Sequence, residues 1–211
     1  MPMVRPAIPV APPGVQQAFR FAPTDAGHIR RLLGWADLPA AAQVLDLGAG
    51  DGSTAAQMQE CRPDLSFCLV DKARTVGAGR LNGPRWRTHC ADLCSVPESD
   101  AAFDAVLCSY AKGYAVGAEF FREVSRLARP GAVVFIVDMV PRASVRPPVA
   151  LFGYTIDARA IVEAEAGAAG LVLDFYMEPL DNSGFGEARF PGLFELFFDE
   201  VRPAIWRFTR S

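Results

Sequence analysis

Hydrophobic and polar positions alternate along this chain in two periods, which predicts strands and helices that follow one another. Short apolar runs, alternating or continuous, are typical of buried strands. The expected strands are Gln43–Leu47, Leu65–Asp71, Arg85–Cys90, Phe103–Ser109, Ala132–Val137, Leu171–Met177 and Ala204–Thr209.

Apolar residues three and four apart predict helices between these strands. The clearest is Gly117–Ala128, which carries its large apolar side chains on one side and stops before the turn Pro130-Gly131. Other expected helices are one or two short ones within Val15–Trp35, then Ser53–Cys61, a weak helix over residues 72–82, Asp157–Ala169, and a short apolar one at Gly192–Val201.

Strands that alternate with helices are typical of a parallel sheet covered on both faces. The chain has 211 residues, the size of one ordinary domain. Met1–Gly14 is rich in proline, so we expect a flexible or extended tail before a single domain over residues 15–211. In that domain, residues 15–41 precede an α/β core over residues 42–211.

Composition and charge exclude several classes of protein. Hydrophobic residues make up 51% of the chain, too many for a disordered protein. The longest strongly apolar run, Gly131–Val137, is far shorter than the roughly 20 residues that cross a bilayer. A net charge of −3 and a pI near 5.4 argue against a nucleic-acid partner, because that binding needs a basic face.

The five cysteines indicate a reduced, cytoplasmic setting, since their number is odd and no secretory leader precedes them. Cys90 and Cys94 lack the usual spacing of a zinc pair, and His89 is adjacent to one of them rather than at ligand spacing. We therefore expect no metal site.

A glycine-rich loop, Gly48-Ala49-Gly50-Asp51-Gly52, joins the first expected strand to a helix. Such a turn brings backbone N–H groups and a helix N-terminus to the carboxyl edge of the sheet, where ligands bind. Its third glycine is one residue early for a dinucleotide fingerprint, and no Gly-Lys-Ser/Thr follows, which excludes a P-loop. Asp46 would repel a pyrophosphate but would attract a cationic ligand such as S-adenosylmethionine.

At these residues the chain resembles a known family. Val44-Leu45-Asp46-Leu47-Gly48-Ala49-Gly50-Asp51-Gly52 is similar to the first motif of the class I S-adenosylmethionine-dependent methyltransferases. Further similar segments follow in order, at Leu69–Asp71, Cys90–Leu93, Phe103–Ser109 and Arg126–Ala132. The resemblance covers about residues 42–140, with a weaker continuation to 210. It implies a three-layer α/β/α sandwich, with a mostly parallel seven-stranded sheet, an antiparallel last strand and a short N-terminal helical lid.

The resemblance also implies site residues for S-adenosylmethionine and its product S-adenosylhomocysteine. In the family, an acid after the second strand, here Asp71, binds the ribose hydroxyls, while Asp92 and the backbone N–H of Leu93 meet the adenine. The alternatives are that Asp92 only caps a turn and that Lys72 is only solvated. The implied cofactor residues are Asp46, Gly48, Ala49, Gly50, Gly52, Asp71, Lys72, Asp92, Leu93 and Ser109.

The family's reaction is an in-line displacement at the sulfonium methyl, with the nucleophile held about 3 Å from that carbon. After the fourth expected strand, the chain lacks the Asn-Pro-Pro-Tyr motif used on base amines and on glutamine, and it has no histidine there. The candidate catalytic residues are Tyr110 and Tyr114, with packing as the alternative, and His28, with simple solvation as the alternative.

Four segments are expected to form the acceptor pocket: residues 15–35, 110–118, 139–156 and 180–200. Their aromatic content favours an apolar or aromatic small molecule. Arg142 and Arg146 either bind an anionic group or stay solvated, and the apolar helix at Gly192–Val201 covers the pocket, packs in the core or forms a homodimer contact. The aromatic residues are Phe19, Phe21, Trp35, Tyr114, Phe152, Tyr154, Phe185, Phe190, Phe194, Phe197 and Phe198.

The leading hypothesis is a methyltransferase that modifies a small metabolite in a biosynthetic pathway. One alternative is an RNA or protein methyltransferase. The other is a protein with the same fold that binds S-adenosylmethionine but acts as a cyclase, a partner subunit or a regulator.

Overall fold

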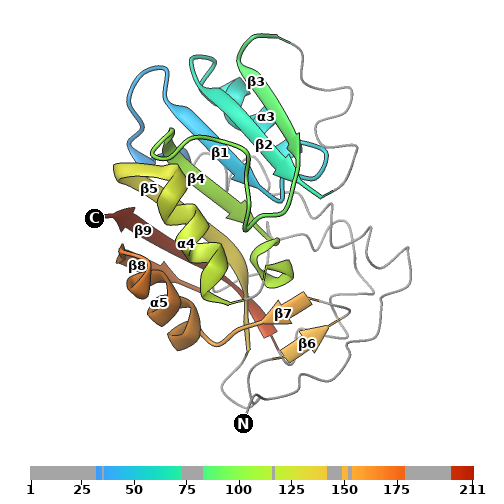
Figure 1. Cartoon of the computed structure of the whole chain (residues 1–211), viewed down its shortest axis with the longest axis vertical. Coiled ribbons are helices and arrows are strands. Elements are labelled where there is room, and N and C mark those ends of the chain that lie inside the picture. The colour runs from blue at the N-terminus through green and yellow to red at the C-terminus, as the bar shows by residue number, and fades with distance from the viewer. Residues whose placement is uncertain are drawn as a thin grey trace.

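A seven-stranded sheet forms the centre of the molecule, seen in a computed structural model (Figure 1). The structure describes residues 32–34, 36–72, 83–115, 117–141, 149–151, 154–178 and 201–211. The order across the sheet is β3-β2-β1-β4-β5-β9-β8. Its strands are β1 (Gln43–Leu47), β2 (Ser66–Asp71), β3 (Trp86–Cys90), β4 (Phe103–Ser109), β5 (Ala128–Pro141), β8 (Leu171–Met177) and β9 (Val201–Arg210).

The strands β3, β2, β1, β4 and β5 are parallel, whereas β9 is antiparallel to both of its neighbours, β5 and β8. This confirms the mostly parallel sheet with an antiparallel last strand. Leu47, near the end of β1, pairs with Val70 of β2 and with Cys108 of β4. The loops that follow these three strands therefore leave the sheet at one edge.

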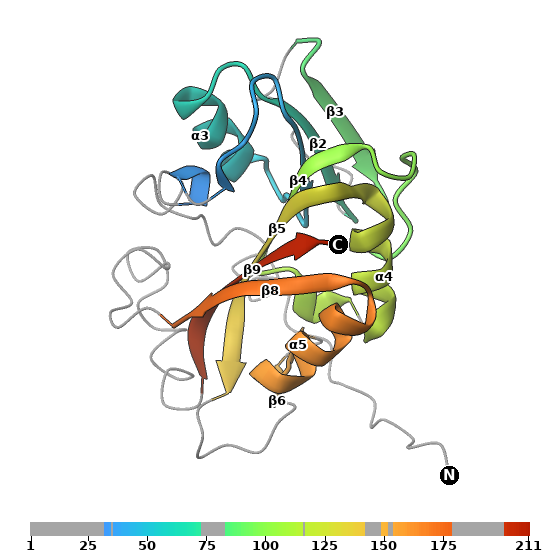
Figure 2. The same cartoon turned by 90° about the vertical axis from the view of Figure 1, so that its left-hand side faces the viewer.

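Helices cover both faces of the sheet, which confirms the three-layer architecture (Figure 2). On one face, α4 (Ala118–Leu127) and α5 (Arg159–Ala168) bury an apolar side against the sheet. On the other face lie α3 (Ser53–Cys61) and a short helical stretch that contains Leu32 and Ala36, both buried. Parallel strands with two covered faces need continuous apolar sequence, as β1, β4 and β5 have.

Strand lengths differ from expectation at the C-terminal half of the sheet. The strand predicted at Ala132–Val137 extends over Ala128–Pro141, because Ala128 pairs with Phe103 of β4 at one end and β9 pairs with β5 as far as Pro141 at the other. β9 in turn begins at Val201, a residue predicted to be helical. At the ends of β5 and β9, pairing with the neighbouring strands outweighs the local pattern of hydrophobic and polar residues.

A two-stranded hairpin, β6 (Val149–Leu151) and β7 (Tyr154–Ile156), was not predicted. Strands of three residues are too short to show a period. β7 contacts the single-turn 3₁₀ helix η1 (Lys112–Tyr114), which follows β4. The hairpin therefore lies beside the segment that leaves the middle of the sheet.

Several predictions fall outside the described residues: the tail at residues 1–14, residues 15–31 of the lid, residues 73–82 of the weak helix and residues 192–200 of the apolar helix. Within the described ranges, no helix is long and apolar enough to span a membrane.

Replacing a core phenylalanine of α4 tests this packing. Phe120 is fully buried and meets Phe121 edge to face, with ring centroids 5.1 Å apart. Phe120→Ala is expected to lower the free energy of unfolding by about 3–5 kcal/mol, because it removes buried apolar area and leaves a cavity. Urea denaturation measures the loss. Val172 is 57% exposed on β8, so Val172→Ala should stay within about 0.5 kcal/mol; equal losses for the two variants would contradict this arrangement.

Candidate active site

The loop after β1 is held against two neighbouring strands. The N–H groups of Gly48 and Ala49 both donate to the Val70 carbonyl of β2, at 2.8 and 3.1 Å. Gly48 has φ +75°, and a Cβ at this position would lie 2.1 Å from the Cβ of Ala111, just after β4. Only glycine combines this backbone conformation with so close an approach. The loop is thereby pressed onto the segment that leaves β4.

The same loop arranges carboxylates around the start of α3. Gly50 donates its N–H to the Asp71 carboxylate at the end of β2, at 3.0 Å, and Ser53 donates to Asp51 at 3.0 Å. Gly52, with φ +78°, precedes the first turn of α3. Gly50 and Gly52 therefore shape the loop and fix neighbouring acids.

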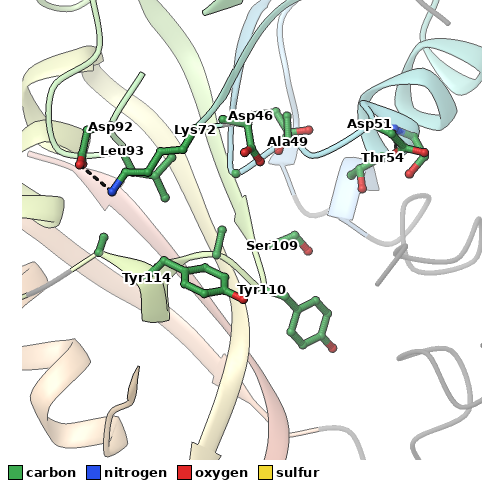
Figure 3. A pocket seen from close by; sticks show the side chains of 15 residues that line it. Asp46, Ala49, Asp51, Thr54, Lys72, Asp92, Leu93, Ser109, Tyr110 and Tyr114 are labelled. Atoms are coloured by element: carbon green, nitrogen blue, oxygen red, sulfur yellow. Dashed lines mark hydrogen bonds and ion pairs between the residues drawn. The ribbon is translucent and has the colours of Figure 1, made fainter. Parts of the chain in front are cut away.

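A cavity opens at this edge of the sheet (Figure 3). One side carries acidic groups from the ends of β1 and β2 and from the segment after β3, and the other carries Tyr110 and Tyr114 from the segment after β4 (Figure 3). It is lined by Asp46, Gly48, Ala49, Asp51, Ser53, Thr54, Asp71, Lys72, Asp92, Leu93, Ser109, Tyr110, Ala111, Tyr114 and Ala115.

Every predicted cofactor residue except Gly50 and Gly52 lines this one cavity, as do the candidates Tyr110 and Tyr114. His28 lies outside the described residues. Tyr154, expected in the acceptor pocket, is not among the lining residues: it is fully buried behind Tyr114.

Sequence reasoning missed the lining residues Asp51, Ser53 and Thr54, and it included Ala111 and Ala115 only as part of the segment 110–118 expected at the acceptor pocket. The first three lie at the end of the glycine loop and in the first turn of α3, so the loop itself was the available signal. The two alanines carry no chemical signal of their own, so the sequence indicated their segment but not the contact of Ala111 with Gly48.

Asp46 is the most perturbed of the lining carboxylates. It is buried, and its Oδ2 has no hydrogen-bond partner among the described residues. Burial, followed by the charge of Asp71, raises the pKa of Asp46 to about 7. A buried carboxylate oxygen without a donor is costly to a fold, so its presence at a cavity indicates a site for a cation or a hydrogen-bond donor.

Asp92 and Lys72 form an ion pair at the cavity, with 2.8 Å between Oδ2 and Nζ (Figure 3). Asp92 also accepts the N–H of Cys94 at 2.9 Å. The Lys72 hydrogen bond, followed by the Cys94 bond, lowers the pKa of Asp92. Asp92 thus caps a turn and faces the cavity at once, and Lys72 is paired rather than merely solvated.

Tyr110 has an unusual backbone for a bulky residue, with φ +51°, and its N–H donates to the Val137 carbonyl at 2.7 Å. Strained backbone of this kind persists where surrounding structure enforces it, often at functional sites. Burial and the nearby Asp138 charge raise the pKa of Tyr110 well above its ordinary value. Its phenol is therefore a hydrogen-bond donor at neutral pH and not a base.

A second cluster with metal-ligand chemistry lies across β2 and β3. The ligand atoms of Cys68, His89 and Glu98 lie within 4.8 Å of one another. The Glu98 Oε1 is also bonded to the Arg87 guanidinium, at 3.0 Å, and burial is the main cause that raises the pKa of Cys68 to about 12. Because the Cys68 thiol is protonated and the Glu98 carboxylate is bonded to Arg87, we interpret the cluster as an ion-pair network. The absence of a metal site stays a prediction.

Comparisons with known proteins identify a domain in this chain and related folds. Residues 44–131 match the family model described as a methyltransferase domain. A search of curated proteins found no significant match.

Solved structures with the same fold include methyltransferases and one cyclase. Geranyl diphosphate C-methyltransferase from Streptomyces coelicolor A3(2) is 14% identical with a TM-score of 0.76, over 88% of this chain and 76% of its own. The [4+2]-cyclase SpnF is 16% identical with a TM-score of 0.67, over 88% of this chain and 80% of its own. Phosphoethanolamine N-methyltransferase 2 from Haemonchus contortus is 16% identical with a TM-score of 0.70, over 85% and 51%.

Residues 44–131 thus match a methyltransferase domain, and the solved structures share the fold of this chain.

The buried Asp46 carboxylate should make the ligand-free protein less stable as pH rises. Its pKa in the folded state, about 7, exceeds the ordinary value of 3.8, so stability is lost between those two pH values as the group ionises in the unfolded chain first. Asp46→Asn is therefore expected to raise the free energy of unfolding at pH 8 by on the order of 1–3 kcal/mol, with a gain close to zero near pH 4. Urea denaturation at both pH values measures this.

Asp92→Asn is the matched control from the same cavity. Its carboxylate is half exposed and paired with Lys72, so its loss should cost between zero and about 1 kcal/mol at pH 8. A destabilised Asp46→Asn protein at pH 8 would contradict the assignment of Asp46 as an uncompensated buried charge.

Proposed function

We propose that this protein transfers a methyl group from S-adenosylmethionine to a small, largely apolar or aromatic metabolite in a biosynthetic pathway. The observation that carries the proposal is the buried Asp46 Oδ2, which lacks a donor and lies at a cavity with three further aspartates. The only cationic side chain among the described lining residues, Lys72, is already paired with Asp92. Such a site suits a cationic ligand without phosphate.

The chain's own residues suggest how the cofactor is held. Asp46 would face its ammonium group, and Asp71, fixed by the Gly50 N–H, would accept from the ribose hydroxyls. Asp92 and the backbone of Leu93 would meet the adenine, for which the Lys72 ion pair must rearrange. When bound, the cofactor supplies a methyl group on a positively charged sulfur.

The acceptor side of the cavity supports an apolar guest. It is formed by Tyr110, Tyr114, Ala111 and Ala115, all in the segment after β4. The rings of Tyr110 and Tyr114 would bound the acceptor on this side. No histidine lines the described part of the cavity, so the rate would come mainly from placing the nucleophile in line with the methyl group.

A cyclase is the second candidate, because the same fold serves the [4+2]-cyclase SpnF. An RNA acceptor has less support, since the one basic side chain of the described cavity wall, Lys72, is already paired with Asp92. Homodimer formation and a cytoplasmic location remain part of the proposal, tested by light scattering and by cell fractionation.

Removing Asp71 tests the cofactor site directly. Asp71→Ala is expected to weaken S-adenosylmethionine binding by about tenfold or more, because it removes the ribose acceptor and the partner of the Gly50 N–H. Calorimetry measures the Kd. Asp64→Ala is a control: this carboxylate bonds Arg62 and the Ala41 N–H away from the cavity. An unchanged Kd for Asp71→Ala, or an equal loss in the control, would count against the site.

Cofactor affinity should depend on pH through Asp46. With a pKa of about 7 in the free protein, Asp46 is protonated below that pH and must release its proton to pair with a cation. Affinity for S-adenosylmethionine should thus fall about fivefold from pH 7 to pH 6, with proton release on binding. Calorimetry in two buffers of different ionisation enthalpy detects the proton. Asp46→Asn should bind weakly at every pH, and an unchanged slope in that variant would refute the role of Asp46.

The reaction itself is tested with labelled S-adenosylmethionine and separate pools of small metabolites, RNA and protein. Label in a small molecule together with S-adenosylhomocysteine release supports the proposal. Label in RNA or protein would show that the acceptor is a macromolecule and would contradict the proposed small-molecule acceptor. Conversion of a metabolite without S-adenosylhomocysteine release would favour the cyclase.

A further inference from the structure

A buried carboxylate interrupts the apolar end of β5. Asp138 is only 5% exposed, and both residues that flank it in the strand are buried and apolar. Its Oδ1 accepts the hydroxyl of Tyr154 and, at 2.7 Å, the N–H of Met139, while Oδ2 has no hydrogen-bond partner among the described residues. A side chain this costly needs an explanation beyond packing.

Tyr154 joins Asp138 to the wall of the cavity. The Tyr154 ring packs edge-on against Tyr114, with centroids 4.8 Å apart and planes at 86°. A Cβ on Gly113 would lie 2.4 Å from the Tyr154 ring. The hairpin strand β7 therefore packs directly against η1. This short helix carries Tyr114 and lies in sequence between the lining residues Ala111 and Ala115.

A second bond ties η1 to the chain beyond β7. The ammonium of Lys112 pairs with Asp157, and both side chains are largely buried, with 3% and 16% exposed. Lys112 also lies over the Phe121 ring of α4, at 5.9 Å. The hydrogen bond of Tyr154 and the ion pair of Lys112 thus hold the short helix on two sides.

We propose that Asp138 and Tyr154 are positioning residues for methyl transfer, whose hydrogen bond, together with the Lys112–Asp157 pair, holds η1 so that Tyr110 and Tyr114 present a fixed wall to the acceptor. The inference rests on the proposed function, because it assigns these tyrosines to the acceptor side. Neither Asp138 nor Tyr154 lines the cavity, so both act through η1.

The charge of Asp138 makes this arrangement sensitive to pH. The titratable and charged groups that interact with it are Tyr154 of β7, Lys112 of η1, Asp157 after β7, and Tyr110 and Cys108 from the β4 side. Burial raises the pKa of Asp138 to about 6, although the Tyr154 and Met139 bonds and Lys112 oppose the rise. Above that pH the Tyr154 hydroxyl donates to an ionised acceptor, which strengthens the bond; below it the bond loses its charge.

Global and local stability should therefore respond to pH in opposite directions. A raised carboxyl pKa means that ionisation of Asp138 costs folding free energy as pH rises from about 4 to about 6. Protection of η1 should instead increase over the range in which Asp138 ionises. If Asp138 and Tyr154 had a purely structural role, the free energy of unfolding and the protection of η1 would change in the same direction with pH.

Hydrogen exchange on the full-length chain tests the proposal without an acceptor. In Tyr154→Phe, which keeps the ring, amide exchange over residues 111–115 should accelerate about tenfold at pH 7.5, while residues 44–50 stay unchanged. In the unmodified protein, the protection factor over residues 111–115 should fall several-fold from about pH 7.5 to pH 5, and Asp138→Asn should abolish that dependence. Tyr176→Phe is the matched control, because it removes a hydroxyl bonded to a carboxylate, Glu178, on the edge strand.

S-adenosylhomocysteine binding is measured in parallel, and its Kd should change less than about threefold in both variants. Once an acceptor is known, Tyr154→Phe should lower kcat by about tenfold or more and leave the KM for S-adenosylmethionine unchanged. If Tyr154→Phe fails to fold, amide exchange over residues 111–115 in the isosteric Asp138→Asn variant tests the proposal instead. Unaltered exchange over residues 111–115 in the variants, or the same acceleration in Tyr176→Phe, would overturn the proposal. Absence of S-adenosylhomocysteine binding in the unmodified protein would instead overturn the proposed function.

Discussion

Gly48 and Ala111 meet where the loop after β1 crosses the segment that leaves β4, and both walls of the cavity depend on this contact. The loop can approach because position 48 has no Cβ and accepts φ +75°. On one side of the contact stand Asp46, Asp51 and Asp71, and on the other Tyr110 and Tyr114. The acidic wall and the tyrosine wall are thus placed relative to each other by the pairing of adjacent parallel strands.

Two buried carboxylates near this edge of the sheet lower the free energy of unfolding when they ionise. Asp46 at the end of β1 and Asp138 near the end of β5 each have one oxygen without a hydrogen-bond partner among the described residues. Burial is the largest cause of the raised pKa in both. Asp46 lines the cavity, where a cation can neutralise it, whereas Asp138 is enclosed and accepts the Tyr154 hydroxyl. The first is suited to binding and the second to fixing a wall, and neither is explained by packing.

The positions of the acids could be predicted because they depend on local pattern. Asp46 and Asp71 lie at the ends of β1 and β2, Asp92 lies just after β3, and parallel strands deliver these ends to one edge. The hairpin of β6 and β7 could not be predicted in this way, since each strand has three residues and no period. Tyr154 was expected at the acceptor pocket and lies behind its wall instead, because the hairpin places it against Gly113 and Asp138.

By itself, then, the amino-acid sequence determined the alternation of strands and helices, the glycine loop and the acids that line the cavity, because each of these is encoded within a few neighbouring residues. Only the tertiary structure decided that Ala111 closes on Gly48, that Lys72 pairs with Asp92, and that Tyr154 bonds Asp138 and packs behind Tyr114. Those contacts join residues that are far apart in sequence or carry no distinctive motif, and packing against the sheet selects them.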